Sequence, residues 1–339
     1  MKWFKRLLGL LLIIIVGVII AALIVINPFG ASPFNRYTKS GSLVLPGLKE
    51  PVTVHRDEKG MAYIYAANME DLFLAQGFVT AQDRLFQMEL TKLFASGRIS
   101  ELAGEKAKDL DIRMRTLGFH RNATKHITLL NEKTRMYFQK YVDGVNAFIE
   151  NRPQEHHLEF KLAGIQPSQW SSADSLTILY YMGWNSAGNI RSEIIAQMLV
   201  EKLGSTKAAE IFPLNINPED EPRGGSARQK SVFAAARLGA VFDEKLLAHL
   251  NAVSLRLGSN NWAVDGKFSS GGKPILANDP HLEASLLPGP WYPCGLITPQ
   301  FRAVGVNIPG MAGMPIGRTE HIAMGVTNAY GDTQDLYVE

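Results

Sequence analysis

The feature of this sequence that most constrains its fold is an apolar run near the N-terminus. Twenty consecutive residues, Leu7–Ile26, carry no charge. A helix of that length spans about 30 Å, which is the thickness of a bilayer core. The run follows Lys2, Lys5 and Arg6, and such a basic flank disfavours a buried helix of a soluble protein. The sequence therefore predicts a basic flank and one transmembrane helix within residues 1–30.

The same basic flank predicts the orientation of the chain. Positive charges beside a membrane span stay on the cytoplasmic side, so the body from about Asn27 onward is expected outside the cytoplasm. The predicted location is a single-pass protein of the cell membrane. A cleaved signal peptide is the alternative, but its apolar region is usually shorter, and the run here ends in Asn27-Pro28-Phe29-Gly30, a poor cleavage site.

Charge and thiol content exclude several classes of protein. Of 35 basic residues, three lie in the flank, which leaves 32 against 32 acidic residues, so no nucleic-acid partner is expected. The single Cys294 excludes an internal disulfide and a multi-thiolate zinc site. His156 and His157 lack the spacing of a zinc helix and are predicted to lie in a solvated loop.

Hydrophobic periodicity predicts helices in the first part of the body and strands in the second. Residues 31–50 are rich in Pro, Gly and Ser and read as a spacer, and residues 52–65 alternate around a turn, which predicts a hairpin. Helical spacing predicts helices at 71–94, 131–150, 173–187 and 192–204. After about residue 257, strands are predicted at 260–264, 274–277, 301–306, 322–326 and 336–338. The predicted fold class is α+β.

A Gly-Ser pair, Gly258-Ser259, stands where the helical pattern gives way to strands. A glycine carbonyl is the least hindered target for the following hydroxyl, and glycine tolerates the strained backbone that such an attack needs. If this bond is cut, Ser259 becomes an N-terminal residue. Its α-amine, with a pKa of about 8, could then activate its own hydroxyl.

Several motifs in a fixed order accompany this pair, and with them the sequence resembles the penicillin acylase family of N-terminal-nucleophile hydrolases. The motifs are Ala81-Gln82-Asp83-Arg84-Leu85-Phe86-Gln87-Met88-Glu89, Gly97-Arg98, Glu101-Leu102, Phe160, Pro167, Trp170, Asp174, Gly258-Ser259-Asn260-Asn261-Trp262, Asn278-Asp279-Pro280-His281, Gly325-Val326-Thr327-Asn328 and Gly331-Asp332. Together they run from about residue 50 to the end.

The resemblance implies an αββα sandwich made by autoproteolysis of one precursor into two chains, which then form a heterodimer. Residues 31–216 correspond to the helix-rich small chain, and residues 217–258 to a linker that is cut at Gly258–Ser259. Residues 259–339 correspond to the start of the strand-rich chain. The implied activity is hydrolysis of a linear amide through an acyl-Ser259 intermediate. β-Lactam side-chain amides, N-acyl homoserine lactones and related acyl amides are the implied substrates.

The resemblance also assigns roles to individual residues. Ser259 matches the N-terminal nucleophile, and His281 matches the position that contacts its α-amine, often His where aliphatic acyl groups are cleaved. Asn328 matches the residue whose backbone N–H forms half of the oxyanion hole. Four positions match the ligands of a structural Ca²⁺, whose oxygen-ligand chemistry they suit. These are Glu193, Asp332, Gln334 and Asp335. No organic cofactor is implied.

The strand-rich chain of the family continues further than this sequence does. The side-chain half of the oxyanion hole, an Asn, and a nearby Arg lie in that further part. The resemblance therefore describes a chain truncated at its C-terminus, with an incomplete sandwich. The alternative function is a membrane-tethered binding or scaffold protein that is inactive because the C-terminal part is missing.

Overall fold

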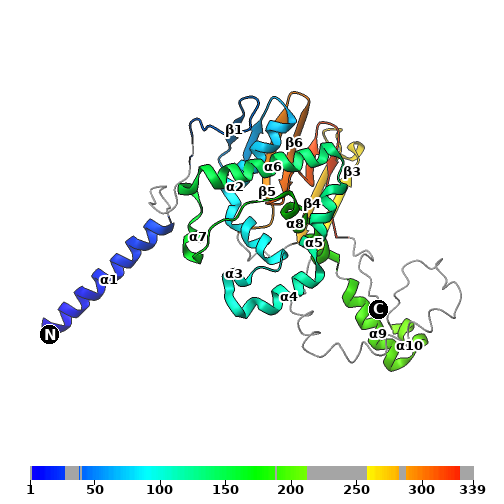
Figure 1. The fold of residues 1–339 in the computed structure, drawn as a ribbon, viewed down its shortest axis with the longest axis horizontal. Helices are drawn as coiled ribbons and strands as arrows, with labels where there is room; N and C mark the ends of the chain where they lie inside the picture. Colours follow the sequence, from blue (N-terminus) through cyan, green and yellow to red (C-terminus); the bar gives the residue numbers. More distant parts are fainter. Residues whose placement is uncertain are drawn as a thin grey trace. The chain divides into compact units, whose positions relative to one another are not determined.

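The computed structural model describes residues 2–26, 38, 40–187, 189–211, 258–281 and 288–328 (Figure 1). The chain divides into two compact units. The first comprises Met1–Tyr180 and Pro288–Ala323, and the second comprises Tyr181–Leu287 and Met324–Glu339. Helices and strands both occur, so the mixed α/β composition expected from the sequence is confirmed.

A six-stranded sheet organises the first unit. Its strand order is β1-β2-β5-β6-β7-β8. The hairpin of β1 (Thr53–Arg56) and β2 (Ala62–Tyr65) is antiparallel, and β2 then pairs in parallel with β5 (Tyr292–Thr298), which lies more than two hundred residues later in the chain. The remaining strands are β6 (Phe301–Asn307), β7 (Ile316–Thr319) and β8 (Ala323–Met324). The hairpin thus joins the two ends of the first unit.

Helix α2 (Met69–Ala95) is the longest element of the first unit's core. The Asn68 side chain caps its start by accepting from the Asp71 N–H at 2.9 Å, and acidic residues in the first turn suit the helix dipole. The Asp71 carboxylate in turn accepts from the backbone N–H groups of Lys49 and Glu50 at 2.8 and 3.0 Å. The cap therefore also fixes the segment that leads into β1.

Two glycines bring α2 into close contact with α6 (Glu132–Asn151), which lies beside it in Figure 1. A Cβ at Gly77 would overlap the Tyr141 carbonyl, and a Cβ at Gly144 would overlap the Leu74 carbonyl. The helix backbones are therefore closer than any residue larger than glycine allows. The Tyr141 hydroxyl, which is fully buried, accepts from the Gly310 N–H at 3.1 Å and ties α6 to the segment after β6.

Two carboxamide side chains each bind both backbone polar groups of one distant residue. Gln76 donates to the Gly313 carbonyl at 2.8 Å and accepts from the Gly313 N–H at 3.1 Å. Asn146 binds the Trp170 carbonyl and N–H in the same way, at 2.9 and 2.8 Å. We call this arrangement a carboxamide clamp. Each clamp satisfies two backbone groups that burial would otherwise leave without partners.

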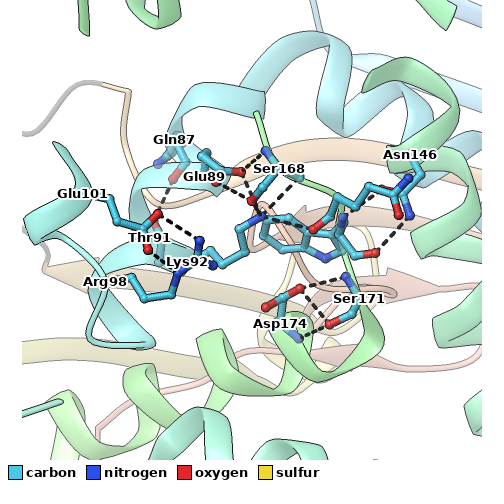
Figure 2. Close-up of polar contacts among 12 residues, drawn as sticks. Gln87, Glu89, Thr91, Lys92, Arg98, Glu101, Asn146, Ser168, Ser171 and Asp174 are labelled. Atoms are coloured by element: carbon cyan, nitrogen blue, oxygen red, sulfur yellow. Dashed lines mark hydrogen bonds and ion pairs between the residues drawn. The ribbon is translucent and has the colours of Figure 1, made fainter. Parts of the chain in front are cut away.

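A buried ion pair within α2 binds Ser168, in the segment that precedes α8 (Ser172–Ala187). Lys92 Nζ lies 2.8 Å from Glu89 Oε2, and the two side chains are only 1% and 3% exposed. The Ser168 hydroxyl donates to Glu89 at 2.8 Å and accepts from Lys92 at 2.7 Å; Figure 2 shows the three side chains pointing toward one another. The ammonium also lies 4.9 Å from the centroid of the Trp170 ring, a favourable cation–π distance.

Shorter elements complete the described residues. In the first unit these are α3 (Ser100–Ala103), η1 (Gly104–Ala107), α4 (Lys108–Leu117), α5 (Phe119–His126), η2 (Ile127–Leu129), η3 (Pro153–Glu155) and α7 (Leu158–Ala163). In the second unit they are α9 (Asn189–Leu203), α10 (Ser205–Ile211), β3 (Gly258–Val264), η4 (Gly266–Phe268) and β4 (Ile275–His281). Strands β3 and β4 form a two-stranded sheet of their own.

The predicted hairpin and the four long helices are confirmed, whereas two strands were missed. Strand β5 contains Pro293 and Gly295, both of which weaken the strand pattern in a sequence. Strand β7 has only four residues. The predicted strand at 336–338 and most of the predicted linker lie outside the described residues, and the layering of two sheets into a sandwich stays a prediction.

Helix α1 (Lys2–Ile26) contains the one stretch, among the described residues, that is long and apolar enough to cross a membrane. This stretch is Arg6–Leu23, with a mean hydropathy of 2.9. Only length and composition support this property, and a signal sequence near an N-terminus would share it. The helix is confirmed, and its crossing of a membrane stays a prediction.

The buried ion pair predicts a large difference between two glutamate substitutions. Glu89→Gln leaves the Lys92 ammonium buried without its anion, and we expect the free energy of unfolding to fall by about 3–5 kcal/mol. Glu105→Gln breaks the pair with Lys108, which has the same spacing but is exposed, and should cost less than about 1 kcal/mol. Urea unfolding of the chain in detergent micelles measures both. Equal losses would contradict the assigned role of the buried pair.

Candidate active site

The predicted nucleophile lies at the start of the two-stranded sheet in the second unit. Strands β3 and β4 pair antiparallel with Gly258 opposite His281 and Ser259 opposite Pro280. Asp265 begins the turn between the strands by accepting from the Lys267 N–H at 3.0 Å. The hairpin register therefore brings His281, twenty-two positions later in the sequence, beside the Gly258–Ser259 peptide.

The Ser259 hydroxyl lies against the peptide bond that precedes it. Its Oγ donates to the Gly258 carbonyl oxygen at 2.6 Å, and the residue is half-buried. The oxygen that would attack is thus next to the carbonyl group that would be attacked. A change of the Ser259 rotamer or of the peptide plane is needed to turn this hydrogen bond into an approach to the carbonyl carbon.

The pairing register separates the hairpin side chains into two sets. Side chains alternate along a strand, and residues directly opposite each other share a face. Ser259 and Pro280 therefore lie on one face, together with Asn261 and Asn278. His281 lies on the other face, together with Asp279 and Asn260. The predicted nucleophile and the predicted histidine are close in register, but their side chains leave opposite faces of the hairpin.

The segment 325–328 lies against the face that carries Ser259. Asn278 forms a third carboxamide clamp: it donates to the Val326 carbonyl at 2.8 Å and accepts from the Val326 N–H at 3.0 Å. The Thr327 hydroxyl donates to the Ser259 carbonyl at 3.0 Å. A Cβ at Gly325 would come within 2.9 Å of the Asn261 side chain, so glycine permits this close approach.

Asn328 directly follows the Thr327 contact in the chain, and its role in an oxyanion hole stays a prediction. The backbone N–H of Asn328 belongs to the peptide that follows Thr327, whose side chain already contacts Ser259. The Asn328 side chain points elsewhere, since its Nδ2 donates to the Ser186 carbonyl of α8 at 2.7 Å. The side-chain amide of Asn328 is therefore engaged with α8, and its main chain follows the residue that contacts Ser259.

On the opposite face, His281 has polar neighbours that fix its ring. Its Nε2 lies 3.0 Å from Asp279 Oδ2 and 3.3 Å from Asn260 Nδ2. A Cβ at Gly258 would be 3.3 Å from His281 Nδ1, so the second ring nitrogen lies toward Gly258. Contact of His281 with a free Ser259 amine stays a prediction.

Three hairpin neighbours were not assigned roles from the sequence. Asn278 and Thr327 hold the segment 325–328, and Asp279 orients the histidine. The signal for Asp279 was present, since residues two apart on a strand share a face and Asp279 stands two residues before His281. No local pattern indicates the partner of Asn278, because Val326 is forty-eight residues away.

The predicted calcium ligands lie mostly outside the described residues. Asp332, Gln334 and Asp335 fall in the range 329–339, which the structure does not describe, and Glu193 is placed only as a backbone position in α9. The described part of the chain contains no group of three or more His, Cys, Asp or Glu side chains that could hold a metal ion. The calcium site stays a prediction.

Other reactive residue types have structural roles. Cys294 is fully buried, and burial raises the pKa of its thiol to about 12, so it is not a nucleophile near neutral pH. His156 and His157 lie in a loop, as predicted, but they are half-buried rather than solvated. His157 contacts the Gln82 carbonyl through Nε2 at 2.9 Å and the Phe86 N–H through Nδ1 at 3.3 Å. His156 Nε2 binds the Ile149 carbonyl at 3.0 Å.

A family model described as penicillin amidase matches residues 51–339. Because this match covers most of the sequence, the chain belongs to the penicillin amidase family. The relatives include an acyl-homoserine lactone acylase, QuiP, of Pseudomonas aeruginosa, 31% identical over 88% of this chain and 36% of the relative. A penicillin acylase 2 proenzyme of a Pseudomonas species is 34% identical over 88% of this chain and 39% of the relative.

The chain thus spans less than two fifths of the length of these two relatives. Penicillin G acylase of Escherichia coli is 26% identical over 87% of this chain and 41% of the relative. Among solved structures, a thermostable penicillin G acylase from Alcaligenes faecalis aligns with 51% of this chain and 96% of its own. That alignment has a TM-score of 0.41 and 27% identity.

The third carboxamide clamp predicts the local stability of the segment beside Ser259. Asn278→Ala removes both bonds to Val326 and the bond to the Asn260 carbonyl. We expect hydrogen exchange of the Val326 amide to accelerate at least about tenfold, since two bonds are worth about 2 kcal/mol. Lys273→Ala, an exposed position in the turn of the same hairpin, should leave this rate unchanged. Equal rates in the two variants would refute the clamp.

Proposed function

We propose that this chain carries the nucleophile of a self-processing amide hydrolase, and that Ser259 is that nucleophile. The observation that carries the proposal is the 2.6 Å contact between the Ser259 hydroxyl and the Gly258 carbonyl. Membership of the penicillin amidase family supports it, since self-cleavage at this position is what the resemblance implies. The hairpin and the segment 325–328 supply the surroundings of the reacting peptide.

Self-cleavage would begin with attack of Ser259 Oγ on the Gly258 carbonyl carbon. The hydroxyl proton passes to the departing amide nitrogen, and an ester replaces the peptide bond. Water then hydrolyses this ester, which leaves a carboxylate on Gly258 and restores the hydroxyl of Ser259. The serine now also has a free α-amine. Cutting one bond therefore creates the base that the next reaction needs.

The second reaction would hydrolyse a linear amide by the same nucleophile. The α-amine accepts the hydroxyl proton while Oγ attacks the substrate carbonyl carbon, the protonated amine leaves, and water releases the acid from the acyl-serine. The named relatives are acylases of penicillins and of acyl-homoserine lactones. We propose an acyl amide of this kind as the substrate: a β-lactam side chain, an N-acyl homoserine lactone or a related amide.

Two further residues would act on this chemistry. The Asn328 N–H would stabilise the negative oxygen of the tetrahedral intermediate, a task that favours a fixed backbone donor. His281 would contact the new α-amine, because its ring already lies beside Gly258 and Asp279 limits its orientation. Cleavage removes the constraint that Gly258 is covalently bound to Ser259, so the amine is free to approach the imidazole.

Mass spectrometry and N-terminal sequencing of the expressed chain test the proposal directly. The wild-type chain should yield a fragment that begins at Ser259, and Ser259→Ala should stay uncut because the attacking oxygen is gone. Ser270→Ala, an exposed serine in the turn of the same hairpin, should be processed like the wild type. An uncut wild-type chain would refute self-cleavage by this chain. Cleavage without hydrolysis of a chromogenic fatty-acyl or phenylacetyl amide would retain self-processing and refute the second reaction.

The same proposal extends to the organisation of the chain. Residues 31–216 would form a small chain, residues 217–258 a linker, and the two products would remain together as a heterodimer within an αββα sandwich. Helix α1 would anchor the small chain in the cell membrane. Its basic flank would stay in the cytoplasm and the body outside, as the distribution of Lys and Arg favours.

A structural Ca²⁺ would be held by oxygen ligands of Glu193, Asp332, Gln334 and Asp335. The support for this part is the match of these positions to the family, together with a donor set of carboxylates and a carbonyl, which Ca²⁺ prefers. The ion would connect Glu193 to residues 332–335, which are far apart in the sequence. Its binding energy would stabilise the folded state.

Thermal unfolding tests the calcium site. We expect the Tm of the chain in detergent micelles to rise by several degrees when millimolar Ca²⁺ replaces a chelator, since binding to the folded state alone is stabilising. Asp335→Asn should abolish this rise, whereas Asp109→Asn, an exposed aspartate of α4, should retain it. A rise that persists in Asp335→Asn, or no rise in the wild type, would exclude the proposed ligand set.

A further inference from the structure

A cavity of about 700 Å³ lies in the first unit, where the β1–β2 turn, the middle of α2 and the start of β5 meet. Its volume is in the range of small-molecule sites. The turn residues 56–61, α2 residues 82–84 and the pair Tyr292-Pro293 line it. All of these belong to the first unit, whereas Ser259 belongs to the second, so the inference below does not rest on the proposed function.

The negative charge of Asp83 in this cavity is already compensated. Arg56 lies 2.6 Å from Asp83 Oδ2, and the Tyr292 hydroxyl donates to the same oxygen at 2.5 Å. Burial, reinforced by Asp83, raises the pKa of Tyr292 well above its usual 10, so the phenol keeps its proton. Arg56 also donates to the Gln82 side-chain oxygen at 3.0 Å. Asp83 therefore has two strong donors on one oxygen.

Arg84, the next residue, is bonded differently. Its Nη1 donates to two neutral oxygens, Gln87 Oε1 at 3.1 Å and the Gly289 carbonyl at 3.2 Å. The guanidinium lies 5.7 Å from the centroid of the Tyr292 ring. No carboxylate within the described residues lies at ion-pair distance from it. Burial lowers the pKa of Arg84, although Tyr292 and Asp83 offset part of this effect.

The half-buried guanidinium of Arg84 donates to neutral oxygens and lacks an anionic partner within the described part of the chain. It presents five N–H donors in a fixed fork that matches the two oxygens of a carboxylate. Asp57, another acid of the cavity, is already engaged, because its Oδ1 accepts from the N–H groups of Lys59 and Met61 at 2.9 Å each. Met61, Pro293 and the Tyr292 ring add apolar surface to the same cavity.

From these observations we infer that the cavity binds a small organic carboxylate, whose carboxylate group pairs with Arg84 and whose apolar part contacts the Met61, Tyr292 and Pro293 side of the wall. Among the described residues, no carboxylate lies at ion-pair distance from Arg84, so the carboxylate of the ligand would supply this missing partner. The apolar part distinguishes this ligand class from inorganic anions. Because Arg84 also donates to the Gly289 carbonyl, ligand binding would affect the segment that leads into β5.

Isothermal titration of the full 339-residue chain in detergent micelles tests the inference, with benzoate as the probe and benzamide as its uncharged isostere. Titrations into empty micelles at constant ionic strength are subtracted. Benzoate should bind saturably, and benzamide at least about tenfold more weakly. Equal affinities, or no saturable binding of benzoate, would overturn the inference.

Two substitutions identify the group that binds the carboxylate. Arg84→Gln should weaken benzoate binding at least about tenfold, whereas Arg302→Gln, an exposed arginine of β6, should leave it within about twofold. Arg84→Lys retains the charge but loses the two-pronged donor geometry, so it should bind benzoate more weakly than the wild type with the fold preserved by circular dichroism. Wild-type affinity in either Arg84 variant would overturn the assignment.

Discussion

The first unit depends on one helix whose polar side chains bind the backbone of other segments. Segments from the N-terminal and the C-terminal parts of the unit pack around α2. Their backbone N–H and carbonyl groups lose contact with water on burial and need hydrogen-bond partners. Asp71, Gln76, Gln87 and Lys92 each bind such groups, in residues 49–50, 313, 288–289 and 168–169 respectively. Because these side chains belong to one helix, they set the relative positions of segments that are not paired with one another as strands. The close contact with α6 at Gly77 and Gly144 fixes the position of α2.

In the second unit, the two faces of the β3–β4 hairpin have different neighbours. The alternation of side chains along the strands puts the Ser259 hydroxyl and the His281 imidazole on different faces, and the segment 325–328 lies against the face that carries Ser259. The Gly258–Ser259 peptide therefore has the segment 325–328 on one side and the His281 ring on the other, with the strand itself between them. In the proposed self-cleavage, the new α-amine of Ser259 would lie at the end of the strand, where it could approach either face.

Much of this architecture is predictable from the sequence, and the limits are physical. Long amphipathic helices such as 71–94 and the hairpin at 52–65 carry their own periodicity. The ordered motifs that accompany Gly258-Ser259 predict the family, which the match over residues 51–339 confirms, whereas the role of Ser259 stays a prediction. Strand β5 is not predictable in this way, because its pairing with β2 depends on residues more than two hundred positions away and its Pro and Gly oppose the local pattern. The interaction of His157 with α2 was missed for the same reason. Local sequence shows a histidine beside a polar loop, whereas tertiary structure supplies the two backbone atoms that it binds.

The three carboxamide clamps have a chemical consequence. The side chains of Gln76, Asn146 and Asn278 each bind the N–H and the carbonyl of one residue, as a residue of a neighbouring strand would. Such binding needs one donor and one acceptor on the same planar group. Hydrolysis of such an amide, with the loss of one ammonia molecule, converts the donor into a second acceptor. The carbonyl it served would then face a negative oxygen. Spontaneous deamidation at any of these positions would therefore weaken a contact between two segments of the fold, rather than alter an exposed side chain alone.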